Sequence, residues 1–142
     1  MAVRAGLVEA VKPSDGGVTA IVIRCAMHTF ISGEDIREFG KVLGSPALDK
    51  INTRLEDCPN PIVAAVHGVT FGGGVGLRLT VISGSRKDAK LGQLKVKLGL
   101  TPGGSGTQRL PRAIGPDRSY SSKLRYHVVK CVRSVCRNRG AR

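Results

Sequence analysis

PIVAAVHGVTFGGGVG, residues 61–76, is the most informative stretch of this 142-residue chain. The apolar, β-branched run over residues 62–66 has the length of a buried strand. The glycines that follow, Gly72, Gly73 and Gly74, let the main chain approach a neighbour that any Cβ would block. We therefore predict a strand, a glycine turn and then a helix. The free N–H groups at such a helix start favour phosphate or an oxygen that becomes anionic during a reaction.

The glycine turn has competing interpretations. A tight strand-to-helix connection that binds no ligand is the simplest of them. The dinucleotide-binding fingerprint G-x-G-x-x-G is not met, because the third position after Gly74 is Leu77, and no Gly-Lys-Ser/Thr phosphate loop exists. The sequence therefore argues against a Rossmann domain and against a nucleoside triphosphatase.

Outward from this stretch, strand patterns alternate with helix patterns. Ser45 is placed to cap a helix with Pro46 at its first position, and the prolines on both sides of Asn60 end that helix. The expected elements are helices over 3–11, 46–57, 74–79 and 107–114 and strands over 18–23, 62–66 and 81–83, with a short helix after Asp35. This order predicts a mixed α/β chain.

The net charge of +13 is unevenly distributed. Residues 119–142 hold seven bases and no acid, which leaves 16 bases against 10 acids, or +6, in residues 1–118. We therefore expect a main domain over 1–118 and a basic tail over 119–142. The apolar face of a tail helix would consist of Leu124, Val128, Cys131, Val132 and Val135.

The cysteines bear on metal binding, and together with the sequences at the two ends they bear on the expected cellular compartment. Four dispersed cysteines predict reduced thiols, and His127, Cys131 and Cys136 are too few and too widely spaced for a structural zinc site. No apolar run reaches membrane-spanning length, and neither a signal peptide nor a peroxisomal Ser-Lys-Leu ending is present. We expect an intracellular protein; peroxisome, mitochondrion and cytoplasm remain open.

Three segments carry a wider resemblance: FISGEDIREF at 30–39, IVAAVHGVTFGGGVGL at 62–77 and KLGQLKVKLGLTPGGSGTQRLPRAIG at 90–115. In this order they resemble the crotonase superfamily of enoyl-CoA hydratases and isomerases, most of all the hydratase half of bifunctional fatty-acid β-oxidation enzymes. The resemblance covers most of residues 1–118. It implies an α/β spiral of strand-strand-helix units, truncated at both ends, and leaves homo-oligomer formation open.

The resemblance also implies an oxyanion site. Enzymes of this superfamily hold the carbonyl oxygen of an acyl-CoA thioester between two backbone N–H groups, and the matching positions here are Glu34 and Gly73. Glu34 departs from the small residue that the family usually has. Coenzyme A enters as part of the substrate, so no separate cofactor is expected.

The two acid/base positions differ from those of a hydratase. Hydratases of the family use two glutamates, and the matching positions here are Gly76 and Lys95, which lies 19 positions later, one fewer than the family spacing. Glycine cannot transfer a proton, and an ordinary lysine is charged at neutral pH. We expect weak or absent hydration, and Gly76→Glu with Lys95→Glu is the direct test for partial rescue.

Other readings remain open. Superfamily members that catalyse isomerisation, dehalogenation or ring closure also lack the first glutamate. The chain could instead be a non-catalytic interaction protein whose basic tail binds an acidic partner or a membrane surface, with nucleic acid less favoured, or a shortened product with no independent role. Among further polar residues, His67, Gln93 and Gln108 are expected to be structural, and Asp35 to start a helix.

Overall fold

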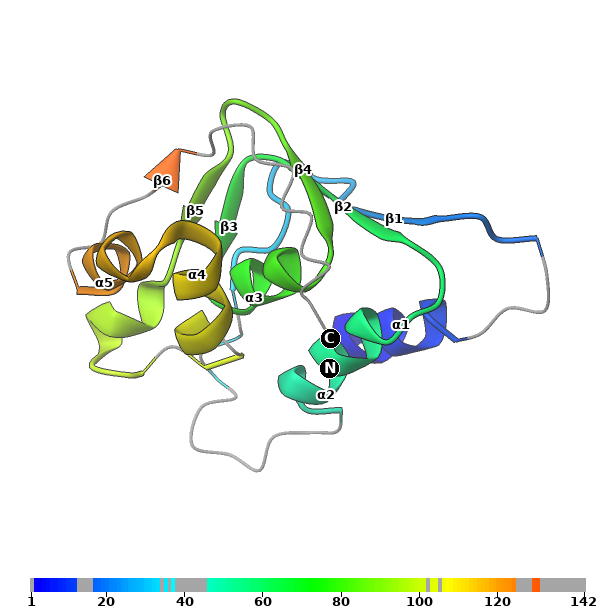
Figure 1. Cartoon of the computed structure of the whole chain (residues 1–142), viewed down its shortest axis with the longest axis horizontal. Coiled ribbons are helices and arrows are strands. Elements are labelled where there is room, and N and C mark those ends of the chain that lie inside the picture. The colour runs from blue at the N-terminus through cyan, green and yellow to red at the C-terminus, as the bar shows by residue number, and fades with distance from the viewer. Residues whose placement is uncertain are drawn as a thin grey trace.

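The computed structural model describes residues 2–12, 17–33, 35, 37, 46–101, 103–104, 106–124 and 129–130. In this part of the chain, a parallel sheet has the strand order β1-β2-β4 (Figure 1). Its strands are β1 (Ile21–Arg24), β2 (Ile62–Val66) and β4 (Ile82–Ser85). The pairing is in register at Ile21 with Ile62 and at Val63 with Ile82.

β2 is the central strand, and its sequence explains its place. Ile62, Ala64 and Val66 are buried, while Val63 and Ala65 between them are partly exposed. This alternation is the two-residue period of a strand with one face against the core. The predicted strand over 62–66 is confirmed at both ends.

Three helices cover the buried face of this sheet: α1 (Ala2–Ala10), α2 (Leu48–Glu56) and α3 (Gly73–Thr80). In Figure 1 they lie below β1, β2 and β4. The core side chains of α2 and α3 are fully or almost fully buried: Ile51, Leu55, Val75, Leu77 and Leu79. The predicted helices over 3–11 and 74–79 are confirmed within a residue of each end.

A second small sheet has the order β3-β5-β6. β3 (Val69–Phe71) runs parallel to β5 (Lys90–Gly92), and β6 (Val129–Lys130) pairs antiparallel with β5. The chain then forms the 3-10 helix η2 (Leu94–Leu98), α4 (Gly106–Ile114) and α5 (Pro116–Leu124). These last three elements lie together at the left of Figure 1.

Some sequence-based expectations were wrong in detail. The second helix begins at Leu48, with Ala47 at the N-cap and no side-chain cap bond, so Pro46 is not its first residue. Ser45 and most of the short helix expected after Asp35 lie outside the described residues. The helix expected over residues 124–135 is interrupted, because Val129 and Lys130 form a strand against β5. Strands β3 and β5 and helix η2 were not expected.

The expected border between main domain and tail falls inside α5, which continues through residue 124. Residues 125–128 and 131–142 of the basic tail lie outside the described part of the chain. No helix within the described residues is long and apolar enough to cross a membrane.

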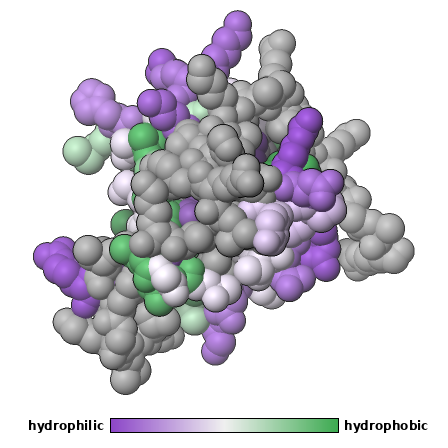
Figure 2. All heavy atoms as spheres, turned by 90° about the vertical axis from the view of Figure 1, so that its left-hand side faces the viewer, coloured by the Kyte–Doolittle hydropathy of each residue, from purple (hydrophilic) through white to green (hydrophobic). Residues whose placement is uncertain are grey.

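The exposed surface mixes charged and apolar side chains. Figure 2 shows the side of the molecule that lies at the left of Figure 1, with hydrophobic surface in its lower part and hydrophilic side chains around it. η2 lies on this side; its last residue, Leu98, is 56% exposed, and Leu100 just after it is 43% exposed. On the outer face of the parallel sheet, Val22 and Ile82 are also exposed.

Candidate functional site

Two segments that are far apart in the sequence lie side by side at the glycine turn. Residues 30–33 run parallel to residues 67–72, and the N–H of Phe71 donates to the carbonyl oxygen of Ile31 at 2.9 Å. A Cβ built on Gly33 would lie 4.0 Å from the oxygen of Phe71. This pairing brings the first and second sequence motifs together.

The glycines at this junction are required by close backbone approach. A Cβ on Gly74 would lie 2.6 Å from the Cβ of Ile31 and 2.9 Å from its carbonyl oxygen. Gly72 has a φ of 53°, a left-handed conformation that other residues rarely adopt, and its N–H donates to the oxygen of Gly92 at 3.1 Å. The turn can therefore hold α3 against residues 30–33 only with glycine at these positions.

A cavity of about 660 Å³ opens at this junction. Gly33, Gly73 and Gly74 line it on one side, and residues of α1, α2 and the segment from β1 to Asp35 complete the wall. Gly73 is the first residue of α3, so its N–H has no acceptor within the helix and carries the positive end of the helix dipole. Glu34, the other expected oxyanion donor, lies outside the described residues.

Charged residues also line this cavity. Arg4 comes from α1 and Arg24 from the end of β1. Asp35 lines it too, but its carboxylate accepts hydrogen bonds from Nε and Nη2 of Arg37 at 3.0 and 2.7 Å. These side-chain bonds, with a further bond from the Arg37 N–H, lower the pKa of Asp35 from 3.8 to about 2. The helix that Asp35 was expected to start lies for the most part outside the described residues.

Gly76, where the resemblance implies the first glutamate, is closed by backbone. Gly76 is buried within α3, and a Cβ built on it would lie 2.5 Å from the carbonyl oxygen of Gly104. The same oxygen accepts a hydrogen bond from Nδ2 of Asn52 at 3.3 Å. Gly104 itself has a φ of 58° and would clash with Leu48 if it carried a Cβ. The turn at residues 103–104 is thus wedged between α2 and α3.

Lys95, where the resemblance implies the second glutamate, lies next to the same turn. Lys95 is in η2, is partly buried, and has its Nζ 3.5 Å from the place of a Cβ on Gly103. Gly76 and Lys95 therefore both lie next to the turn at residues 103–104. Among the described residues that line the 660 Å³ cavity, neither of the two occurs.

The remaining polar candidates have structural surroundings. Nε2 of His67 donates to the carbonyl oxygen of Met27 at 2.7 Å, which confirms the structural role expected for this histidine. Gln93 is buried against Gly106, and its amide atoms have no hydrogen-bond partner among the described residues. Gln108 is exposed. The described residues contain no group of three side chains suited to a metal ion.

Sequence reasoning missed Asn52 and Gly104. The helical period put Asn52 on α2 without distinguishing it from its neighbours, although it is completely buried. Gly104 belonged to a glycine-rich turn, and nothing in that turn indicates which residue it contacts. An asparagine spaced with Leu48 and Leu55 on the apolar face of a helix was the one signal that the sequence offered.

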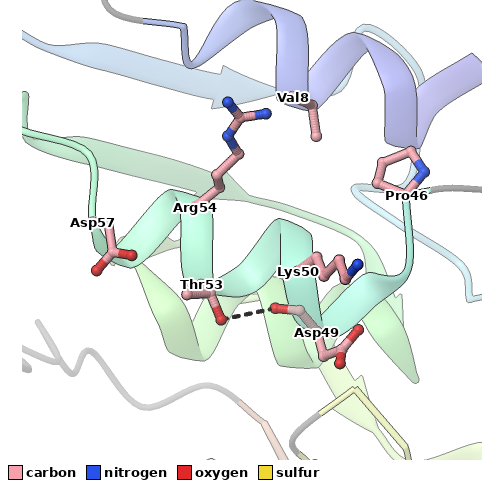
Figure 3. Close-up of a pocket in the computed structure, with 7 residues that line it drawn as sticks. All are labelled: Val8, Pro46, Asp49, Lys50, Thr53, Arg54 and Asp57. Carbon is pink, nitrogen blue, oxygen red and sulfur yellow. Dashed lines mark hydrogen bonds between the residues drawn. The ribbon is translucent and has the colours of Figure 1, made fainter.

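A second cavity, of about 380 Å³, lies between α1 and α2 (Figure 3). Two acids and two bases of α2 and its end line it: Asp49, Lys50, Arg54 and Asp57. Arg54 extends toward α1 near Val8, and the hydroxyl of Thr53 donates to the backbone oxygen of Asp49 at 3.1 Å. The opposite charges balance, so this groove does not favour an anionic ligand.

Comparison with known proteins identifies the family. The family model described as enoyl-CoA hydratase/isomerase matches residues 2–123. The Bacillus subtilis protein named probable enoyl-CoA hydratase is 39% identical over 110 residues, which are 72% of this chain and 43% of that protein. Human mitochondrial methylglutaconyl-CoA hydratase is 41% identical over 116 residues, 76% and 34% of the two chains. The Danio rerio peroxisomal bifunctional enzyme is 44% identical over 103 residues, which are 72% of this chain and 14% of that protein.

Solved structures of enoyl-CoA hydratases are also similar to this chain. Enoyl-CoA hydratase subunit I of Geobacillus kaustophilus has a TM-score of 0.72 and 30% identity, with 87% of this chain and 49% of that chain covered. An enoyl-CoA hydratase/carnitine racemase of Magnetospirillum magneticum has a TM-score of 0.78 and 26% identity, with 89% and 52% covered. The expected crotonase-like arrangement of an α/β chain is thereby confirmed.

This chain spans less than half the length of the curated relatives above and about half of the solved chains. The three ordered motifs, the glycine turn that they build and the match over residues 2–123 agree on one assignment. The chain belongs to the enoyl-CoA hydratase/isomerase family, within the crotonase superfamily.

Proposed function

We propose that this chain binds an acyl-CoA thioester in the 660 Å³ cavity and does not hydrate enoyl-CoA. One observation carries the proposal: Gly33 and Gly73 open into this cavity, whereas Gly76 lies against the carbonyl oxygen of Gly104. The proposed binding position at Gly73 is thus separate from Gly76 and Lys95, which do not line this cavity. Relatives named peroxisomal bifunctional enzyme and fatty acid oxidation complex subunit alpha favour a fatty acyl chain on the thioester.

The first turn of α3 supports the binding part. In this proposal the thioester oxygen accepts a hydrogen bond from the N–H of Gly73, at the positive end of the α3 dipole. Such a preorganised donor contributes about 10²- to 10³-fold to a rate where an oxyanion develops. Apolar side chains around it, among them Leu7, Ile31 and Leu77, provide a surface for the uncharged part of the ligand.

The acid/base positions support the absence of hydration. Adding water to an enoyl thioester requires a base for the water and an acid at the α-carbon, each worth about 10²- to 10⁴-fold. Gly76 carries no group that transfers a proton, and Lys95 is a lysine instead of a carboxylate. A ligand bound at Gly73 therefore meets no carboxylate at either position.

Calorimetric titration with butyryl-CoA tests the binding proposal. Gly6 of α1 lines the cavity, and a Cβ there has no atom within 4 Å, so Gly6→Phe adds a ring next to the cavity without a backbone clash. Gly84 of β4 also has open space but does not line the cavity, which makes Gly84→Phe the matched control.

We expect Gly6→Phe to weaken butyryl-CoA binding at least tenfold and Gly84→Phe to bind like the wild type. Wild-type protein that takes up no butyryl-CoA would contradict the proposal. Equal affinities in all three proteins would place the ligand elsewhere on the chain.

A further inference from the structure

We infer that β1 is a docking edge for a second copy of this chain, and that the β1 strands of two chains pair antiparallel about a two-fold axis. The inference goes beyond the proposed function and does not depend on it. β1 lies at one edge of the sheet order β1-β2-β4 (Figure 1). Among the described residues, β2 is the one strand that pairs with it.

The backbone of β1 directs hydrogen-bonding groups to its open side. The N–H of Ile21 donates to the carbonyl oxygen of Pro61 at 2.9 Å. Successive residues of a strand point their backbone groups to opposite sides, so Ile21 and Ile23 face β2, whereas Val22 and Arg24 face away from it. Among the described residues, the outward groups have no backbone partner. A row of such groups is a template for another strand.

The sequence of β1 lacks the features that protect a sheet edge. Residues 18–23 read VTAIVI, without a charge or a proline, and β-branched residues dominate them. Edge strands usually carry lysine, proline or a bulge that discourages pairing. Val22 is 62% exposed and Val18 is 41% exposed. The side chains of β1, like its backbone, therefore favour the addition of a strand.

A second β1 fits this edge because a two-fold axis through Val22 makes the edge complementary to itself. Val22, Val63 and Ile82 form one row across the outer face of the sheet. When Val22 pairs with the same residue of the second chain, this row continues into the matching row of that chain. Arg24 then lies opposite Ala20 of the second chain, which keeps the two arginine charges apart. Cross-strand pairs of β-branched residues stabilise antiparallel pairing.

The opposite edge of the sheet is less suited to a partner. β4 has the sequence ISGS, in which the glycine and the serines lower the preference for a strand. Pairing β1 of one chain with β4 of the next would leave a further β1 open and build a filament, whereas β1 with β1 closes at two chains. The net charge of +13 opposes long assemblies of such chains. The closed dimer is therefore the assembly that we propose.

Sedimentation equilibrium of the 142-residue chain tests the inference, at about 1–100 µM protein and in about 0.3 M salt, which screens the repulsion between two basic chains. Val22→Lys and Ile82→Lys are matched variants. Each replaces an exposed apolar residue of the outer face by a positive charge, on β1 and on β4 respectively. Val22→Pro removes the outward N–H but none of the hydrogen bonds between β1 and β2. Circular dichroism checks that each variant folds.

We expect a weak wild-type dimer with a dissociation constant of about 10–100 µM, because a single strand pair is smaller than a standard interface. Val22→Lys and Val22→Pro should weaken it by about tenfold or more, and Ile82→Lys should leave it within about twofold of the wild type. A wild type that stays monomeric at every concentration overturns the inference. An equal loss in Ile82→Lys also overturns it, since the contact would then lie on the outer face or at β4.

Hydrogen exchange locates the contact in the wild type without any substitution. As the protein concentration rises through the dissociation constant, exchange of the Val22 and Arg24 amide protons should slow severalfold. The amide protons of Ile21 and Ile23, which face β2, should change little. Slow exchange at Val22 and Arg24 that does not depend on concentration would mean that a segment of the same chain covers the edge, which overturns the inference.

Discussion

The carbonyl oxygen of Gly104 lies 2.5 Å from the point where a side chain on Gly76 would begin. Helix α3 and the turn before α4 are therefore packed backbone against backbone at Gly76, where the family resemblance implies a glutamate. Nδ2 of Asn52 donates to the same oxygen and is itself completely buried. The chain lacks both the carboxylate and the space that a carboxylate would occupy.

The first prediction concerns this contact alone. Gly76→Ala should lower the free energy of unfolding by about 1–2 kcal/mol, because overpacking costs about 1–3 kcal/mol and the gain in helix propensity offsets about 0.5–1 kcal/mol. Denaturant unfolding measures the change. Gly84→Ala, whose Cβ meets no atom within 4 Å, is the control and should stay close to the wild type. A Gly76→Ala protein as stable as the wild type would contradict this prediction, because the 103–104 turn would then move away from the new methyl group without a measurable cost in stability.

The second prediction concerns rescue. Restoring both acids, by Gly76→Glu with Lys95→Glu, should not produce hydration of crotonyl-CoA. The Gly104 carbonyl blocks the space that the new side chain on α3 would need, while Lys95→Glu alone meets no such obstacle. Loss of the enoyl absorbance measures the reaction, and wild-type protein should be equally inactive. Turnover by the double variant, or turnover by the wild type at the rate of an intact hydratase, would refute the steric explanation.

The third prediction is a pH dependence created at Asn52. In Asn52→Asp only the protonated acid can donate to the Gly104 oxygen, and burial raises the folded pKa of that carboxyl above its unfolded value of about 3.9. Its stabilising bond is thus present below about pH 4 and is lost as pH rises through the folded pKa.

Unfolding midpoints at pH 4 and pH 7 test this expectation. We expect Asn52→Asp to lose about 3 kcal/mol relative to the wild type at pH 7 and distinctly less at pH 4. Asn52→Leu, which has a similar volume and no charge, should show the same loss at both values of pH. If the loss of unfolding free energy in Asn52→Asp did not depend on pH, the new carboxyl would have moved out of its buried position next to the Gly104 oxygen, which would contradict the prediction.

The fourth prediction concerns Asp35. Its carboxyl should titrate at about pH 2, because side-chain hydrogen bonds from Arg37 stabilise the ionised form, and Arg37→Gln should return the pKa toward 3.8. The folded pKa lies below the unfolded one, so any stability from this pair exists above about pH 3.8 and disappears as pH falls through 2. Carboxyl chemical shifts followed by NMR measure both values. An unchanged titration in Arg37→Gln would contradict the assigned cause.

Local sequence was sufficient where one segment determines its own structure. The β-branched run after Pro61 predicted β2 with its observed bounds, and the glycines predicted the turn into α3. Gly74 lies against Ile31 because the motif at 30–39 pairs with this turn. The resemblance implied that arrangement, which no periodicity could have supplied.

Contacts between distant segments could not be predicted in the same way. β3 and β5 have three residues each, too few for an alternating pattern, and they become strands through pairing with each other. The contact of Gly76 with Gly104 joins two backbones, so no side-chain pattern marks it. Lys95 was identified as a departure from the family, yet its place next to the 103–104 turn follows only from the contact of η2 with that turn.

The register of the parallel sheet has a consequence for the order of folding. Val63 pairs with Ile82 across 19 positions that include β3, the glycine turn and α3, whereas Ile21 pairs with Ile62 across 41 positions. Closing the longer connection costs more chain entropy, and local contacts form earlier. We expect β2, α3 and β4 to assemble first and β1 to join last. Amide protons of β1 should then exchange faster with solvent than those of β2 that face β4, so the cavity wall formed by the end of β1 should open more easily than the β2–β4 pair.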